Sequence, residues 1–120
     1  MDKKVNVLGT EYAVSFHDYK DKPIFEERSI GGYSDDVFHE IVICNLKTHP
    51  VYEDETEEWC KMLEKRILRH EIVHAFFSES GLQDSTCQVD APWAKNEEMV
   101  DWIAIQFPKL LQAFKDADCI

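Results

Sequence analysis

The sequence predicts an α+β fold in which a small N-terminal sheet, antiparallel or mixed, packs on a central helix and a second, C-terminal helix. The first half of the chain is rich in alternating and β-branched segments, whereas apolar residues in the second half recur at spacings of three and four. Strands followed by helices are typical of the α+β class. The length of 120 residues, 44% of them hydrophobic, indicates one domain that covers residues 1–120.

The strands are expected in three segments. Residues 5–16 alternate between polar and apolar side chains and form the first candidate. Residues 24–30 form a short second candidate, after which Gly31 and Gly32 indicate a turn. Residues 38–46 give the strongest strand signal in the chain, and its core, residues 41–45, is a candidate edge strand that could pair with an extended peptide.

The central helix is expected to begin at a capping box formed by Asp54 and Glu57. Gly81 marks its end, and a break into two helices near residue 60 is a second option for so long a span. The helix has a wide apolar surface, as expected of a central buried helix. The residues that form it are Trp59, Met62, Leu63, Ile67, Ile72, Val73, Phe76 and Phe77.

A loop over residues 83–95 and a second helix from about Asn96 complete the chain. Pro108 is expected to end or kink this helix, because proline lacks the backbone N–H that continues a helical ladder. The apolar side of this helix comprises Val100, Ile103, Ala104 and Phe107. After the proline, a final helical stretch is expected from Leu110, Leu111 and Phe114.

The formal charge of -11 argues against nucleic acid and anionic membrane surfaces as partners. The first residues lack the apolar stretch of an export signal, and no apolar run has the length of a membrane span. The cysteines are scattered and form no C-x-x-C pair, so we expect reduced thiols and a cytoplasmic protein. They are Cys44, Cys60, Cys87 and Cys119.

The string His70-Glu71-Ile72-Val73-His74 falls inside the predicted central helix and is the most informative motif. Residues four apart lie on one face of a helix, so both imidazoles can reach one ion at about 2.0 to 2.1 Å. Glu71 points elsewhere, and its carboxylate can act as the base that activates a zinc-bound water. The pattern therefore predicts Zn²⁺ held by His70 and His74, with Glu71 as the catalytic residue.

A catalytic zinc ion generally takes a third protein ligand. The metzincin extension fails, because Phe77 and Ser80 stand where that pattern requires Gly and His. A carboxylate at the start of the second helix can complete the set, either Glu97 or its neighbour Glu98. Asp101, one turn after Glu97, could accept the free imidazole N–H of a ligand histidine.

These residues resemble the thermolysin-type gluzincin pattern, H-E-x-x-H followed by N-E-x-x-x-D. The match covers His70, Glu71, His74, Asn96, Glu97 and Asp101. The short chain is similar to minimal gluzincins of the ImmA/IrrE-like kind, which occur in phages, prophages and their hosts. The resemblance implies a zincin-like fold, with Glu97 as the third ligand and Asp101 as the residue that orients a ligand histidine. It also implies a peptide or protein substrate and the cytoplasm of a bacterial or phage-infected cell.

Three functional hypotheses follow. The first is zinc-dependent hydrolysis of a peptide bond. Tyr33 or His39, near the strongest strand, could reach the site to steady the oxyanion, but a structural role is the first expectation for both. The second is a catalytically silent zincin-fold module of phage or prophage origin that binds a protein. The third is a metal-free core in which the motif letters are accidental. Glu71 favours the first hypothesis, because a purely structural metal site does not need this carboxylate.

Overall fold

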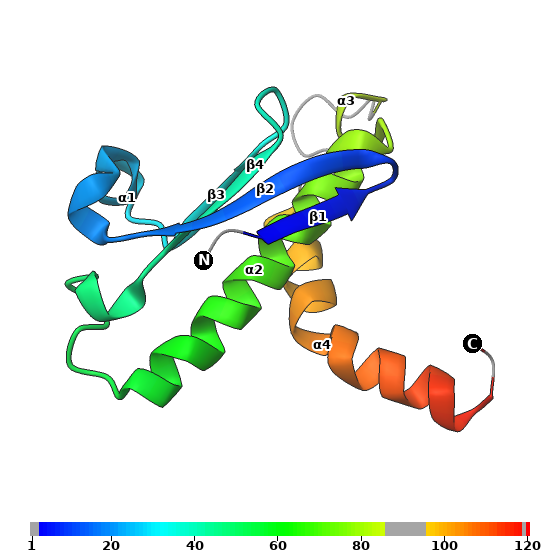
Figure 1. Cartoon of the computed structure of the whole chain (residues 1–120). Helices are drawn as coiled ribbons and strands as arrows, with labels where there is room; N and C mark the ends of the chain where they lie inside the picture. Colours follow the sequence, from blue (N-terminus) through cyan, green and yellow to red (C-terminus); the bar gives the residue numbers. More distant parts are fainter. Residues whose placement is uncertain (1–2, 86–95, 119) are drawn as a thin grey trace.

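The computed structural model describes residues 3–85, 96–118 and 120. Four strands form one sheet in the order β1-β2-β4-β3, with β1 at Lys3–Val7, β2 at Thr10–His17, β3 at Gly32–Asp35 and β4 at Glu40–Cys44. The two outer pairs are antiparallel and the central pair, β2 and β4, is parallel. The fold is α+β and its sheet is of the mixed type (Figure 1).

The first predicted strand is two strands joined by a hairpin turn. Leu8 and Gly9 form the loop, and both have positive φ, at 51° and 93°. Two central residues with positive φ define the type I′ turn, whose twist matches that of the flanking strands. The prediction of one strand over residues 5–16 was wrong here, because alternation continues through a two-residue turn of this kind without interruption.

The second predicted strand, residues 24–30, is a helix. The structure has helix α1 at Pro23–Arg28, with proline at its first position, where the missing N–H has no partner to lose. Ser29 adopts a left-handed conformation with φ 51° and ends the helix. A 3-10 turn, η1, precedes α1 at Tyr19–Asp21. The apolar residues at positions 24, 25 and 30 suggested a strand, but Glu26, Glu27 and Arg28 are good helix formers.

The strongest predicted strand, residues 38–46, corresponds to β4, which is shorter at both ends. It is a central strand between β2 and β3, so the expectation that residues 41–45 lie at an edge was wrong. The edge strand is β3, and it begins at Gly32 where a turn was expected. A second 3-10 turn, η2 at Leu46–Thr48, follows β4.

The central helix, α2, is continuous over Glu57–Glu79 and has no break near residue 60. Its N-cap is Thr56, whose hydroxyl accepts a hydrogen bond from the Trp59 backbone N–H at 3.1 Å, so the capping box at Asp54 was wrong. The helix ends as predicted, with Gly81 just beyond it at φ 81°.

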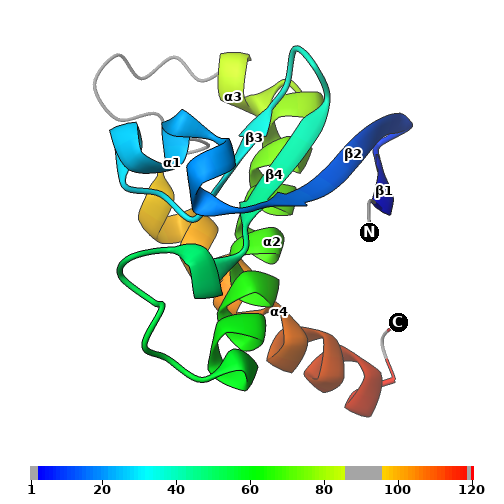
Figure 2. The ribbon, with the colours of Figure 1, turned by 60° about the vertical axis from the view of Figure 1, so that its left-hand side comes forward.

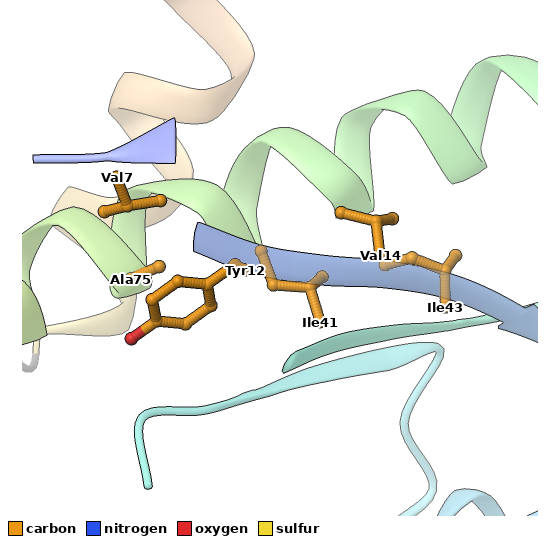
Figure 3. Packing of buried hydrophobic residues seen from close by; sticks show 6 residues of the cluster. All are labelled: Val7, Tyr12, Val14, Ile41, Ile43 and Ala75. Atoms are coloured by element: carbon orange, nitrogen blue, oxygen red, sulfur yellow. The ribbon is translucent and has the colours of Figure 1, made fainter. Parts of the chain in front are cut away.

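Successive β4 residues face opposite sides of the sheet and contribute to two hydrophobic clusters. Ile41 and Ile43 pack with residues of β1, β2 and α2, including Ala75 (Figure 3). Val42 and Cys44 pack on the other side with Phe25 of α1. Figure 2 shows α1 and α2 on opposite sides of the β3–β4 pair. Strand β4 is therefore buried on both faces, which explains why its apolar residues are continuous rather than alternating.

Two glycines let α2 approach the edge strand closely. A Cβ atom added at Gly32 would lie 2.8 Å from Cγ2 of Ile67, and one at Gly31 would lie 2.9 Å from Cδ1 of the same side chain. Both distances are shorter than real Cβ contacts allow. Because Ile67 precedes His70 by one helical turn, this close approach sets how near the motif lies to β3.

Helix α4 spans Glu97–Asp116 and begins where predicted, because the side chain of Asn96 accepts a hydrogen bond from the Met99 N–H at 2.8 Å. It continues through Pro108, so of the two outcomes expected at the proline, an end or a kink, the end was wrong. A short helix, α3, occupies Leu82–Ser85 within the predicted loop, and residues 86–95 of that loop lie outside the described part. Among the described residues, no helix combines the length and apolar character needed to cross a membrane.

Candidate metal centre

The paired histidines of α2 project from adjacent turns of the helix toward a common point. Their Nε2 atoms lie 3.1 Å apart, and each side chain is only 16% exposed. The i, i+4 spacing places both rings on one face, as the sequence predicted. Two imidazole nitrogens this close need a proton or a cation between them, because two lone pairs facing each other repel.

Helix α4 brings the carboxylate of Glu97 to the same point. Its Oε2 lies 3.1 Å from Nε2 of His70 and its Oε1 lies 3.0 Å from Nε2 of His74. One donor atom from each of the three residues falls within 4.8 Å of the others. Glu98 does not belong to this group, so of the two carboxylates that the sequence left open the structure brings Glu97 to the histidines.

Asp101 lies one turn further along α4 and orients His70. Its Oδ1 is 2.6 Å from Nδ1 of His70. A carboxylate only accepts hydrogen bonds, so the Nδ1–H group must donate. If the second ring nitrogen carries no proton, Nε2 of His70 and the Glu97 oxygen 3.1 Å away are two acceptors that face each other. A cation at this point would satisfy both.

Glu71 lies beside the three donors but does not join them. Its Oε1 is 4.0 Å from Nε2 of His70, and the residue is 7% exposed. Burial raises the pKa of the Glu71 carboxyl, against the opposing effects of His70, His74 and a hydrogen bond from the Ser34 hydroxyl. The carboxyl is thus held in a low-dielectric environment at the edge of the donor cluster, where raised proton affinity suits a general base.

The cluster opens into a cavity of about 570 Å³. Strand β3 supplies one wall through Gly32, Tyr33 and Ser34, while Arg28 of α1 and Gln83 of α3 line other parts. Tyr33 therefore lies where the sequence suggested a role at the oxyanion. His39 does not line the cavity and instead lies 3.7 Å from the carboxylate of Glu79, which fits the structural role expected for it rather than a role at the oxyanion.

The donor set fits zinc in both chemistry and spacing. Two histidine nitrogens and one carboxylate form a ligand set used by catalytic zinc sites. Two nitrogens at tetrahedral positions around zinc are separated by about 3.3 Å, given Zn–N distances of about 2.0 to 2.1 Å. The distance of 3.1 Å between the Nε2 atoms of His70 and His74 is close to this value.

The cavity also contains residues that the sequence analysis did not identify. Ser34 of β3 lines the cavity, and Arg28 lines it from the end of α1. A strand assigned to residues 32–35 would have placed Gly32 and Ser34 on one face toward the central helix. No local sequence pattern marks Arg28 as a cavity residue. The segment around it was predicted to be a strand rather than helix α1.

Comparison of the chain with protein-family models, curated proteins and solved structures gives no match.

Proposed function

We propose that this protein is a zinc-dependent metallopeptidase that hydrolyses a peptide bond. The observation that carries the proposal is the convergence of His70, His74 and Glu97 on one point, with the buried carboxylate of Glu71 beside it. The resemblance of the two motifs to minimal gluzincins of the ImmA/IrrE-like kind supports the same reading, including a cytoplasmic, phage- or prophage-related setting.

The residues divide the chemistry between them. His70, His74 and Glu97 would hold the metal, and Asp101 would fix the imidazole of His70. Zinc, when bound, supplies a Lewis acid that increases the acidity of water and polarises a peptide carbonyl. The cavity around these residues has the size of a site for a small ligand or a short peptide segment.

Glu71 moves the proton. Its carboxylate accepts a proton from the attacking water as the water oxygen bonds to the carbonyl carbon. The same carboxyl group then donates that proton to the leaving nitrogen as the C–N bond breaks. The Ser34 hydroxyl, beside this carboxylate, favours its charged form and so opposes the rise in the pKa of Glu71 that burial causes.

The proposal is tested by measuring zinc content and cleavage together. The wild-type protein, Glu71→Gln and His74→Ala are purified with added zinc, analysed for metal, and incubated with a mixed-sequence peptide pool that is read by mass spectrometry. We expect about one zinc ion per chain and cleavage for wild type, retained zinc without cleavage for Glu71→Gln, and loss of both for His74→Ala. Glu58→Gln, at an exposed position of α2, is the matched control and should behave as wild type.

Two outcomes would contradict the proposal. Zinc binding without any cleavage that depends on Glu71 would favour the catalytically silent binding module. A protein that takes up no zinc, and in which His74→Ala changes only the stability of the fold, would favour the metal-free core.

A further inference from the structure

Arg28 lies at the end of α1 and lines the cavity that contains the metal donors. Among the described residues that line this cavity, it is the only lysine or arginine. The residue is exposed, so its guanidinium is accessible to a molecule that enters from solvent. A positive charge therefore stands within the same cavity as Glu71 and Glu97.

Among the side chains that the structure describes, none forms an acidic partner for this guanidinium. No ion pair or side-chain hydrogen bond joins Arg28 to another described residue, although the chain has 24 acidic residues against 13 lysines and arginines. Two lysines on other surfaces do have such partners, since Lys4 pairs with Glu11 and Lys61 with Glu64. In a chain this acidic, an arginine in the cavity that pairs with none of the described carboxylates needs an explanation.

The backbone that carries Arg28 is firmly held. Phe25, three residues earlier, is fully buried in the cluster with Val42 and Cys44. The N–H of Ser29 donates to the carbonyl of Glu26 at 3.3 Å, and that of Ile30 donates to the carbonyl of Phe25 at 3.2 Å. The side chain is thus free to pair while its point of attachment is fixed relative to the cavity, which lowers the entropy cost of binding.

We propose that Arg28 is a specificity-determining residue that selects peptides with a carboxylate close to the bond presented to Glu71. This inference rests on the proposed peptide substrate. A guanidinium pairs with a carboxylate through two parallel N–H···O bonds, which gives direction as well as charge. The carboxylate belongs either to an Asp or Glu side chain or to the C-terminus of the substrate, and the chemistry at Arg28 is the same for both.

The test measures binding, so it does not depend on turnover. All proteins carry Glu71→Gln and are supplied with zinc. Three fluorescein-labelled octapeptide pools are compared by anisotropy: Glu at one fixed central position with an amidated C-terminus, Gln at that position with an amidated C-terminus, and Gln with a free C-terminus. We expect the Glu pool or the free-carboxylate pool to bind about five- to tenfold more tightly than the neutral pool. The pool that gains affinity identifies the source of the carboxylate.

Variants of Arg28 separate the inference from general charge effects. Arg28→Gln should remove the preference, whereas Lys20→Gln, which changes the net charge equally at an exposed position outside the cavity, should keep it. Arg28→Glu should reverse the preference toward a pool with Lys at the fixed position, which a misfolded protein would not do.

Equal binding of all three pools to the Arg28 protein, or a preference that persists in Arg28→Gln, would overturn the inference. Cleavage assays with Glu71 intact distinguish this failure from failure of the proposed function. Cleavage that shows the same peptide preference with Arg28 and with Arg28→Gln would contradict the specificity role and leave the proposed peptidase activity intact. Arg28-dependent preference for a carboxylate, without any cleavage when Glu71 is intact, would contradict the peptidase activity and leave Arg28 as a residue that selects carboxylates.

Discussion

The side chain of Arg69 donates a hydrogen bond from Nε to the backbone carbonyl of Ala104 at 2.7 Å. In a regular helix this carbonyl would accept from the residue four positions later, which is Pro108 and has no N–H. Arg69 therefore satisfies the acceptor that the proline leaves free, which explains why α4 continues through Pro108. The same bond ties α4 to α2 next to His70, and so holds Glu97 and Asp101 in place.

The first prediction concerns this bond. Arg69→Met should lower the free energy of unfolding by about 1–3 kcal/mol, because the Ala104 carbonyl would be left without a partner. In a Pro108→Ala background the restored N–H supplies the partner, so the same substitution should cost less. Urea denaturation of the two single variants and the double variant measures the coupling. Equal costs of Arg69→Met in both backgrounds would contradict this account of the helix.

The second prediction concerns Asp101, whose carboxylate accepts from Nδ1 of His70. Asp101→Asn removes the charge and allows the wrong imidazole tautomer, so zinc affinity should fall by about 10- to 100-fold. Competition with a fluorescent zinc chelator measures the change. Because Asn is nearly isosteric with Asp, the fold should be retained, as circular dichroism would show. An unchanged affinity would mean that Asp101 does not orient the histidine.

The third prediction compares the two adjacent carboxylates at the start of α4. Glu97→Gln should weaken zinc binding by at least about 100-fold, because a charged ligand is lost, whereas Glu98→Gln should leave it near the wild-type value. Both substitutions remove one negative charge from the first turn of the same helix, so their effects on helix stability should be similar. The opposite ranking in the same chelator competition would move the third ligand to Glu98.

The fourth prediction concerns the close approach of α2 and β3. Gly32→Ala places a methyl group 2.8 Å from Cγ2 of Ile67, and such overpacking should cost about 1–3 kcal/mol. The cost should be smaller in an Ile67→Ala background, where the opposing atom is absent. Thermal and urea unfolding of the four proteins give the coupling, and additive costs would show that the contact does not limit the packing.

The fifth prediction is a dependence of stability on pH that arises from His49. Burial lowers the pKa of this imidazole, with a hydrogen bond to the backbone of Ile30 acting in the opposite direction. Below the unfolded pKa of about 6.5, the unfolded chain takes up the proton more readily than the folded protein, so stability falls as the pH falls.

Urea denaturation at pH 8, 7 and 5.5 tests this dependence on the wild type and His49→Gln. The variant should be less stable at pH 8, because it loses the packing of His49 between Tyr19 and Tyr52. Its loss of stability between pH 7 and 5.5 should nevertheless be smaller than that of the wild type. Parallel curves for the two proteins over this range would contradict the assignment to His49.

The sequence was informative where one periodicity dominated a long segment. The existence of α2, its end before Gly81 and the start of α4 at Asn96 followed from spacing and capping, although the N-cap of α2 is Thr56 rather than Asp54. Periodicity failed where an element of secondary structure spans only a few residues. The Leu8–Gly9 turn does not interrupt alternation, and α1 is too short for a helical period to stand out.

The candidate site shows the same division. The i, i+4 spacing fixes how His70 and His74 lie relative to each other, because one helix carries both. The contacts of Ser34 with Glu71 and of Arg69 with Ala104 depend on how separate elements pack, and no local pattern encodes that packing. Arg28 was missed for a further reason, since its place in the cavity follows from a helix that the sequence analysis assigned as a strand.

The arrangement of the sheet affects the order in which the chain can fold during synthesis. Its two antiparallel hairpins can both form once residue 44 has left the ribosomal exit tunnel, and they join through the parallel pairing of β2 with β4. The apolar face that includes Tyr12 and Ile41 gains its cover only when the later half of α2 emerges, with Ala75. A nascent chain that stalls after β4 but before the later half of α2 exposes the apolar face of the sheet. Such an exposed face favours aggregation and is the kind of surface that chaperones bind.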